Sequence, residues 1–268
     1  MIDGTGDIAP DDEALRSGEL NVLGRIRSAS NATFLCESHR GDHSVHCVYK
    51  PVAGEQPLWD FPDGTLAGRE RAAYVISAAL GWNIVPHTII REGPAGRGMV
   101  QVWVDEMEDV ENELIDLCPI DSIPRGFLPV LRAHDYRGDE VALVHADDVR
   151  LRRIAVFDVI INNADRKGGH VLTAVDGRVY GVDHGVSLHV EDKLRTVLWG
   201  WAGTPVDDSM MEAVAELDRV LAGPLSTELS EHITVREITA LQKRVSDLLR
   251  DPVMPIPDGR RPIPWPAF

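Results

Sequence analysis

The fold of this chain is decided by residues 162–185, which read NNADRKGGHVLTAVDGRVYGVDHG. A dense polar cluster opens the stretch, and two short β-prone runs follow it, separated by the turn dipeptide Asp176-Gly177. Such a dipeptide between apolar runs is typical of a tight β-hairpin. Because a hairpin brings its two ends together, we expect Asp165 and Asp183 to lie at one site.

Hydrophobic spacing predicts the elements on either side of this stretch. The first part of the chain is β-rich with one helix, and the part after the acidic residues 105–113 is expected to be mainly helical. We place the N-terminal lobe at residues 1–105 and the C-terminal lobe at 106–268. The last 17 residues contain six prolines and are expected to form an extended tail on the surface. Strands are predicted at 19–27, 33–37, 44–52, 84–91 and 98–104, and helices at 69–80, 149–162, 207–221 and 234–249.

The net charge of the chain restricts the classes of partner that we expect it to bind. Among 268 residues, 43 are acidic and 27 are basic, which gives a net charge of −16. Nucleic-acid binding and docking on an anionic membrane both depend on clustered Lys and Arg, so we expect neither. The N-terminal residues lack the apolar core of a signal peptide, and no run is long enough to span a membrane. Because Cys36, Cys47 and Cys118 are too widely spaced for a disulfide framework, the sequence predicts reduced thiols and a cytoplasmic protein.

A lysine stands inside the predicted strand 44–52, in the run VYKP. Taken alone, Lys50 is explained by a side chain that lays its stem along apolar surface and keeps its charge in water. Together with Asp165 and Asp183, however, it completes a set that phosphoryl transfer requires. In such a set a lysine holds phosphates, one aspartate binds the metal, and another orients the acceptor.

Three motifs give the chain a family resemblance: KPVAGEQP at residues 50–57, Asp165-Arg166, and Asp183-His184-Gly185. With them the chain resembles, over residues 20–203, the phosphatidylinositol 3-/4-kinase-like group of the protein-kinase-like fold, which includes the bacterial HipA-type kinases. It is especially similar to uncharacterised bacterial kinase-like proteins. The resemblance implies an α+β, bilobal fold, in which a small antiparallel β-rich N-lobe with one helix precedes a larger, mainly helical C-lobe.

The resemblance also implies ATP and Mg²⁺ as cofactors and assigns roles to the motif residues. Lys50 would contact the α- and β-phosphates, with either Glu55 or Glu70 as its acidic partner. Asp183 would hold Mg²⁺ where the ion bridges the phosphates. Asp165 would orient or deprotonate the acceptor hydroxyl.

Further roles follow around the nucleotide. The loop 28–32 would cover the phosphates, and the strand 101–104 would be the hinge that hydrogen-bonds adenine. Lys167, two residues after Asp165, would steady the γ-phosphate, and an exposed loop lysine is an equal alternative. The residues assigned to the phosphate cover and the hinge are Ser28, Ser30, Asn31, Gln101, Trp103 and Val104.

His170 departs from the family pattern. It stands five residues after Asp165, where the family has the asparagine that binds a second metal ion. Mg²⁺ prefers oxygen ligands, and a neutral imidazole is a poor substitute. Three outcomes follow: one metal ion held by Asp183, a softer ion such as Mn²⁺ with His170 among its ligands, or nucleotide binding without catalysis.

These residues predict an ATP-dependent kinase that acts on a hydroxyl of a soluble small molecule or protein. One alternative is a nucleotide-binding pseudokinase with a regulatory role, and another is AMP transfer on the same scaffold. A metal-dependent hydrolase built from Asp165, His170, Asp183 and His184 ranks lower, because it leaves Lys50 without a role. No nucleic acid and no stable membrane association are expected.

Overall fold

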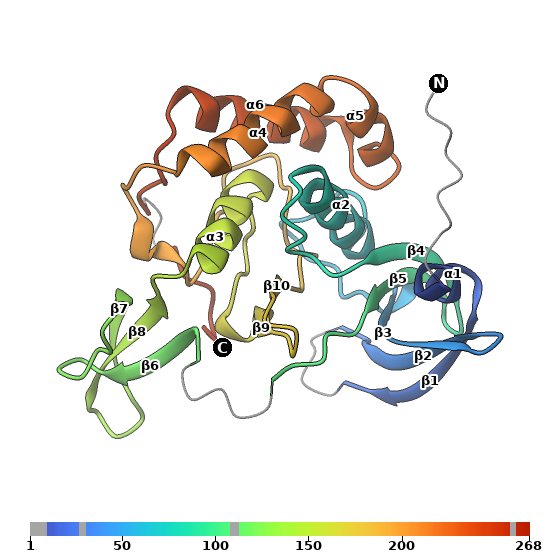
Figure 1. Ribbon diagram of the computed structural model, residues 1–268, viewed down its shortest axis with the longest axis horizontal. Coiled ribbons are helices and arrows are strands. Elements are labelled where there is room, and N and C mark those ends of the chain that lie inside the picture. Colours follow the sequence, from blue (N-terminus) through green and yellow to red (C-terminus); the bar gives the residue numbers. More distant parts are fainter. Residues whose placement is uncertain (1–9, 27–30, 108–112, 258–260) are drawn as a thin grey trace.

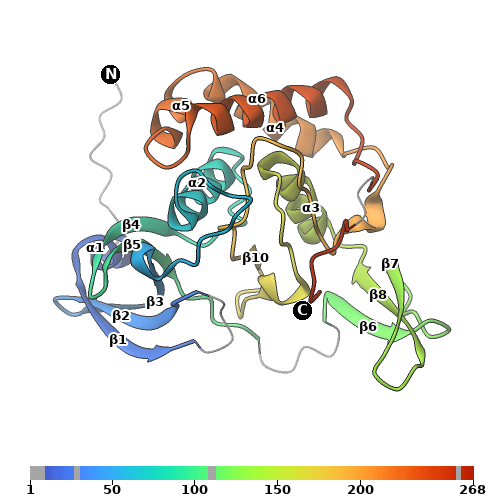
Figure 2. The ribbon, with the colours of Figure 1, turned by 180° about the vertical axis from the view of Figure 1, so that it is seen from behind.

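The structure, a computed structural model, describes residues 10–26, 31–107, 113–257 and 261–268. Two antiparallel sheets lie at opposite ends of the molecule, with helices between and above them (Figures 1 and 2). The five-stranded sheet near the N-terminus has the order β1-β2-β3-β5-β4. Its strands are β1 (Glu19–Arg25), β2 (Phe34–Arg40), β3 (His43–Pro51), β4 (Thr88–Gly93) and β5 (Gly96–Val102).

All five strands that the sequence predicts for this sheet are present, with ends shifted by a few residues. Cys47 and Tyr49 alternate along β3 and are completely buried, as expected for a strand with one face on the core. A short helix that the sequence does not predict, α1 (Pro10–Ser17), packs here, and Ser38 Oγ donates a hydrogen bond to its Ala14 carbonyl at 2.7 Å. Its first turn is acidic, so its apolar stripe is too short to detect from spacing.

The helix of the N-terminal part, α2 (Leu66–Ala79), begins three residues before the predicted range of 69–80. Thr65 caps it, because its side chain accepts a hydrogen bond from the Gly68 amide at 2.9 Å. The Glu55 carboxylate accepts two more bonds from backbone amides of the first turn, at 2.9 and 2.8 Å. This turn is therefore set by polar caps, which hydrophobic spacing does not register.

A second sheet, which the sequence does not predict, follows residue 113 at the start of the part that is expected to be mainly helical. Its strands β6 (Ile115–Pro119), β7 (Phe127–His134) and β8 (Glu140–Ala146) are antiparallel and lie in the order β6-β8-β7. Only β8 has a run of buried residues, and β7 has none. Because the edge strands of this sheet bury few residues, apolar and polar residues alternate only weakly along them. The sequence pattern therefore does not reveal these strands.

Helices make up most of the remaining chain, and the predicted ranges 149–162, 207–221 and 234–249 are confirmed to within about two residues. The layer of α4, α5 and α6 covers α2 and α3 (Figure 1). The largest hydrophobic core is formed by α2, α3, α4 and α6 together. Among the described residues, no helix combines the length and apolar character needed to span a membrane. The four helices of this part are α3 (Val149–Ile161), α4 (Asp208–Leu221), α5 (Pro224–Leu229) and α6 (Val235–Arg250).

The predicted hairpin is also present, as β9 (Val171–Thr173) and β10 (Val179–Gly181). The chain that leaves the five-stranded sheet runs beside it, and the Met107 amide donates to the Thr173 carbonyl at 3.0 Å. The crossing between the two parts of the chain thus packs directly on the hairpin. The division of the lobes at residues 105 and 106 falls at this crossing and stays a prediction.

The proline-rich tail follows the surface of the C-terminal part. The Pro262 carbonyl accepts hydrogen bonds from the Thr196 amide at 3.0 Å and from Trp199 Nε1 at 2.8 Å. Further on, the Ala267 carbonyl accepts one from the Gly168 amide at 2.8 Å. The tail is therefore fixed to the segments on either side of the candidate site.

A buried ion pair joins α2 to α6. The side chains of Arg69 and Glu237 contact each other directly and are 1% and 2% exposed. Arg69 also donates from Nε to the Ser187 carbonyl at 2.9 Å and from Nη1 to the Asp63 carbonyl at 2.8 Å. Glu237 belongs to the predicted capping box of α6, in which its carboxylate accepts from the Thr234 amide at 2.8 Å.

We expect Arg69→Met to lower the free energy of unfolding by about 3–5 kcal/mol, because it leaves the Glu237 carboxylate buried without its cation. Urea denaturation measures the change. The matched control is Arg219→Met, which removes an exposed pair with Glu216 on α4 and should lower the free energy of unfolding far less, because water screens this pair. Equal losses in both variants would contradict the assigned role of Arg69.

Candidate functional site

Three charged side chains meet where the five-stranded sheet faces the hairpin. Lys50 on β3 donates from Nζ to Glu70 Oε1 at 2.7 Å and to Asp183 Oδ1 at 2.8 Å. Glu70 belongs to α2, and Asp183 follows β10. The second oxygen of Glu70 accepts from the His184 amide at 2.9 Å, so this carboxylate holds the strand and the turn together.

Burial and charge shift the pKa values of these three groups in different directions. The positive charge of Lys50 holds the pKa of Asp183 well below its usual value, although burial opposes this. Burial raises the pKa of Glu70, and the charge of Lys50 only partly offsets that. For Lys50, burial lowers the pKa, but Asp183 and Glu70 more than compensate and raise it overall. Lys50 therefore carries a fixed positive charge at neutral pH.

The structure distinguishes the two acidic residues that the sequence offers as partners of Lys50. Glu70 forms the pair, and its side chain is 2% exposed. Glu55 instead caps α2, as described above. The partners of Glu55 lie only about a dozen residues further along the chain. The contact between Glu70 and Lys50, by contrast, depends on how α2 packs against the sheet.

Asp183 has an uncommon backbone conformation, with φ at +60°. A non-glycine residue in the left-handed region costs about 1–2 kcal/mol, and aspartate tolerates it better than most. The cost is offset because the neighbouring His184 amide can then reach Glu70. The side chain of Asp183 is half exposed, so one carboxylate oxygen contacts Lys50 while the group stays open to solvent.

Arg166 is the centre of a second buried cluster. Its guanidinium donates from Nη2 to Asp158 Oδ1 at 2.9 Å and from Nε to Oδ2 at 3.0 Å, and neither side chain is exposed. It also donates to the Val182 carbonyl at 3.0 Å and the His170 carbonyl at 3.2 Å, and lies 2.7 Å from His184 Nε2. Arg166 thus fixes the loop after α3 against the turn that carries Asp183.

Asp165 lies in this loop beside Lys167, with 3.3 Å between Oδ2 and Nζ. The backbone amide of Asp165 donates a hydrogen bond to the side-chain oxygen of Asn163 at 3.0 Å, which helps to orient the loop. Burial raises the pKa of Asp165, and the charge of Lys167 lowers it in part. The charge of Asp183 raises it further, which shows that the two aspartates interact. The structure thus brings together the aspartates that the hairpin was expected to join.

His170 lies against Asp183, with 3.5 Å between Nε2 and Oδ2. Its other ring nitrogen, Nδ1, accepts a hydrogen bond from the Lys167 amide at 3.5 Å, which assigns the proton to Nε2. Burial lowers the pKa of His170 to about 4, so the ring is neutral at pH 7. In this geometry the ring presents an N–H to Asp183, which suits orientation of the carboxylate.

The carboxylates present at the site fit an open Mg²⁺ site. Within the described residues, no three His, Cys, Asp or Glu side chains converge as in a closed metal cage. Mg²⁺ in nucleotide-dependent enzymes is held by one or two carboxylates, with phosphates and water completing the octahedron. Asp183, which is half exposed and ionised, has the oxygens for this role, and Asp165 is the neighbouring carboxylate.

The residues assigned to the phosphate cover and the hinge are partly placed by the structure. Ser28 and Ser30 lie outside the described residues. Asn31 accepts from the Gln56 amide at 2.8 Å, which connects the cover to the loop before α2. Gln101 lies inside the sheet, where its amide donates to Thr88 Oγ1 at 2.8 Å. Residues 103 and 104 lie beyond the end of β5 and line a cavity of about 430 Å³.

One residue of the site, Asp158, is not among those that the sequence analysis selects, although its position gives a detectable signal. Asp158 is an acidic residue on the apolar face of α3, and a buried charge requires a partner. The arginine of the Asp165-Arg166 motif is that partner. His184, which belongs to the Asp183-His184-Gly185 motif, is fully buried, and burial holds its pKa well below its usual value.

No family model matches the chain. "Protein Rv2133c" of Mycobacterium tuberculosis (strain ATCC 25618 / H37Rv) is 65% identical over 267 residues, and the match covers 96% of each chain. The chain belongs to the Rv2133c family. The name Rv2133c states no activity, so membership of this family assigns no reaction by itself.

Solved structures place the Rv2133c family by fold. The Golgi casein kinase matches with a TM-score of 0.50 and 13% identity, over 89% of this chain and 72% of that one. The Helicobacter pylori proinflammatory kinase CtkA matches with a TM-score of 0.42 and 10% identity, over 90% and 94%. At such low identity the likeness to the casein kinase shows the fold alone. The predicted α+β, protein-kinase-like fold is thereby confirmed.

We expect His170→Asn to flatten the dependence of stability on pH between about 4 and 6.5 in metal-free buffer. The pKa of His170 is lowered to about 4, so in this range the unfolded chain binds a proton that the folded chain does not. Stability therefore falls as the pH is lowered, by about 1.4 kcal/mol per unit from this group. Urea denaturation across the range measures the slope.

The control for this prediction is His43→Asn, which makes the same change at an exposed position at the start of β3. This variant should keep the slope of the unaltered protein. The explanation fails if His170→Asn and His43→Asn leave the same slope.

Proposed function

We propose that the chain is an ATP-dependent phosphotransferase that acts on a hydroxyl of a soluble small molecule or protein. The proposal is carried by one observation: Lys50 bridges a buried glutamate and a half-exposed aspartate, within electrostatic range of Asp165. The fixed positive charge of Lys50 suits the phosphates of a nucleoside triphosphate, and the ionised, accessible carboxylate of Asp183 suits the metal ion that accompanies them. The protein-kinase-like fold supports the same reaction class.

Each residue has a defined part in the proposed reaction. Lys50 binds the α- and β-phosphates, and Asp183 holds Mg²⁺, which when bound neutralises charge on the phosphates. Asp165 accepts the proton of the acceptor hydroxyl as its oxygen attacks the γ-phosphorus. The bond from that phosphorus to the β–γ bridging oxygen breaks, and ADP leaves. Lys167 lies at the same carboxylate, where its charge can contact the γ-phosphate.

His170 takes a supporting part in this proposal. Its ring is neutral and presents Nε2–H to Asp183, so we propose that it orients the metal-binding carboxylate and does not itself bind the metal ion. Lys50 donates to Oδ1 and His170 lies at Oδ2, so each oxygen of Asp183 has one donor and keeps a further lone pair with which it would bind a single Mg²⁺. One-metal catalysis is thereby favoured over a second ion bound by His170.

Two substitutions test the reaction. Asp183→Asn should abolish Mg²⁺-dependent stabilisation of the protein by ATP, because it removes the charge that holds the ion. Asp165→Asn should keep nucleotide binding but slow transfer of the γ-phosphate by at least about 100-fold. Thermal denaturation with ATP measures binding, and ATP labelled at the γ-phosphate measures transfer to protein, metabolite extract or water. Asp176→Asn, an exposed change in the β9–β10 turn, is the control.

The alternatives give different outcomes in the same experiment. A pseudokinase binds ATP with Mg²⁺ but shows no turnover in the unaltered protein. AMP transfer places label in the product from ATP labelled at the α-phosphate and none from the γ-phosphate. Transfer that persists unchanged in Asp165→Asn excludes the proposed role of this residue.

The pH dependence of turnover provides a further prediction. Because Lys167 lowers the pKa of Asp165, Lys167→Met should raise that pKa. A proton acceptor with a raised pKa loses activity at a higher pH on the acid side. We therefore expect the acid limb of kcat/KM for ATP turnover to move to higher pH in Lys167→Met. An unchanged or lowered limb contradicts the coupling between the two residues.

A further inference from the structure

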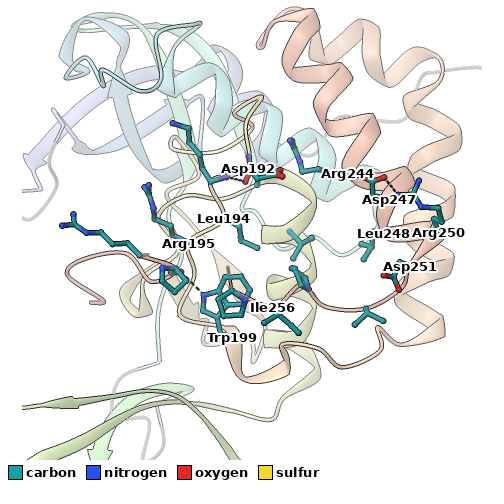
Figure 3. Close-up of a pocket in the computed structure, with 18 residues that line it drawn as sticks. Asp192, Leu194, Arg195, Trp199, Arg244, Asp247, Leu248, Arg250, Asp251 and Ile256 are labelled. Atoms are coloured by element: carbon teal, nitrogen blue, oxygen red, sulfur yellow. Dashed lines mark hydrogen bonds and ion pairs between the residues drawn. The ribbon is translucent and has the colours of Figure 1, made fainter. Parts of the chain in front are cut away.

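A cavity of about 770 Å³ lies on the C-terminal part (Figure 3), and its lining residues include neither Lys50 nor Asp183. Its walls are the segment 192–199, the C-terminal half of α6, and the tail residues 253–257 and 261–262. Apolar side chains form much of its surface, among them Trp199, Leu248 and Ile256. A cavity of this size is typical of a site for a small molecule.

The cavity is positively charged in a chain that is strongly negative. Five of its lining residues are basic and three are acidic, whereas the whole chain has a net charge of −16. Two of the basic groups are already neutralised, because Lys193 lies 3.2 Å from Asp60 and Arg250 lies 2.6 Å from Asp247. Within the described residues, the guanidinium groups of Arg195 and Arg261 have neither a hydrogen bond nor an ion pair.

Arg244 adds a fixed charge to the wall of this cavity. It donates from Nε to the Ile160 carbonyl at 2.9 Å and from Nη1 to the His189 carbonyl at 3.2 Å. Its Nη2 is buried and has no hydrogen-bond partner among the described atoms. Burial lowers the pKa of Arg244 to about 10, so it remains charged at pH 7. Its two hydrogen-bond acceptors are neutral carbonyl groups, and the negative charges of Asp192 and Glu237 offset the effect of burial only in part.

Arg195 connects the cavity to the proposed proton acceptor. Its amide donates to the Asn163 carbonyl at 2.9 Å, and its carbonyl accepts from the Arg166 amide at 3.1 Å. These two residues flank Asp165, and the charge of Arg195 contributes to the field at that carboxylate. Arg195 therefore joins the cavity to the loop that carries Asp165.

We propose that this cavity binds the acidic end of the phosphate acceptor, a small molecule that carries a hydroxyl and a carboxylate or phosphate group. The unpaired guanidinium groups of Arg195 and Arg261 bind the anion, and the apolar wall excludes water around the carbon chain. The hydroxyl then points toward Asp165. This inference rests on the proposed kinase activity for the role of the ligand, but the cavity binds the anion without nucleotide.

Binding is tested without ATP, so the result does not depend on catalysis. The probes are glycerol 3-phosphate and glycerate, with neutral glycerol as the comparison, and titration calorimetry measures the dissociation constants. We expect the anions to bind with a dissociation constant on the order of 1 mM, and Arg195→Ala and Arg261→Ala each to weaken binding by about tenfold or more. Arg219→Ala, an equal loss of charge on α4, should leave binding unchanged.

A further variant separates this cavity from the phosphate site. In Lys50→Met the anions should bind as they do to the unaltered protein, because Lys50 does not line the cavity. Loss of binding in Lys50→Met, full binding in the double variant Arg195→Ala with Arg261→Ala, equal binding of neutral glycerol, or no anion binding by the unaltered protein would each overturn the proposal. Failure of ATP turnover with anion binding intact would instead refute only the kinase.

Discussion

Two neighbouring charged residues on α2 determine how the parts of the molecule are placed. Arg69 reaches α6 and the Ser187 carbonyl, while Glu70 reaches Lys50 and the His184 amide. Both side chains are buried, so each is tolerable only when its partners are present. Because the two residues lie in one turn of α2, a single position of this helix satisfies the contacts to the sheet, to the turn at Asp183 and to α6.

The two aspartates of the site differ in a way that separates their proposed tasks. Lys50 lowers the pKa of Asp183, which keeps it ionised as a metal ligand must be, whereas burial raises the pKa of Asp165, as a proton acceptor requires. The net charge of −16 is compatible with a small anionic ligand at this site because Lys50 contacts Asp183 and Lys167 lies at Asp165. The negative charge of the whole chain therefore disfavours the binding of large anionic partners more than the binding of small ones.

The sequence predicts the elements that carry chemistry better than those that only pack. Lys50, Asp165 and Asp183 stand at the ends of short, strongly patterned elements, so their convergence follows from the hairpin. The choice of Glu70 over Glu55 requires the packing of α2 against the sheet, which no local pattern contains. The sheet β6-β8-β7 is not predicted for a different reason: its edge strands bury too few side chains for apolar and polar residues to alternate clearly.

The contacts of the loop around Asn31 have a mechanical consequence. Asn31 and Ala32 are hydrogen-bonded to Gln56 and Gly54, and the intervening Glu55 holds the first turn of α2. The segment at Asn31 and the helix that carries Glu70 are thus joined through one carboxylate. Because Arg69 on the same helix contacts Glu237, this chain of contacts continues from the five-stranded sheet to α6 on the far side of α2.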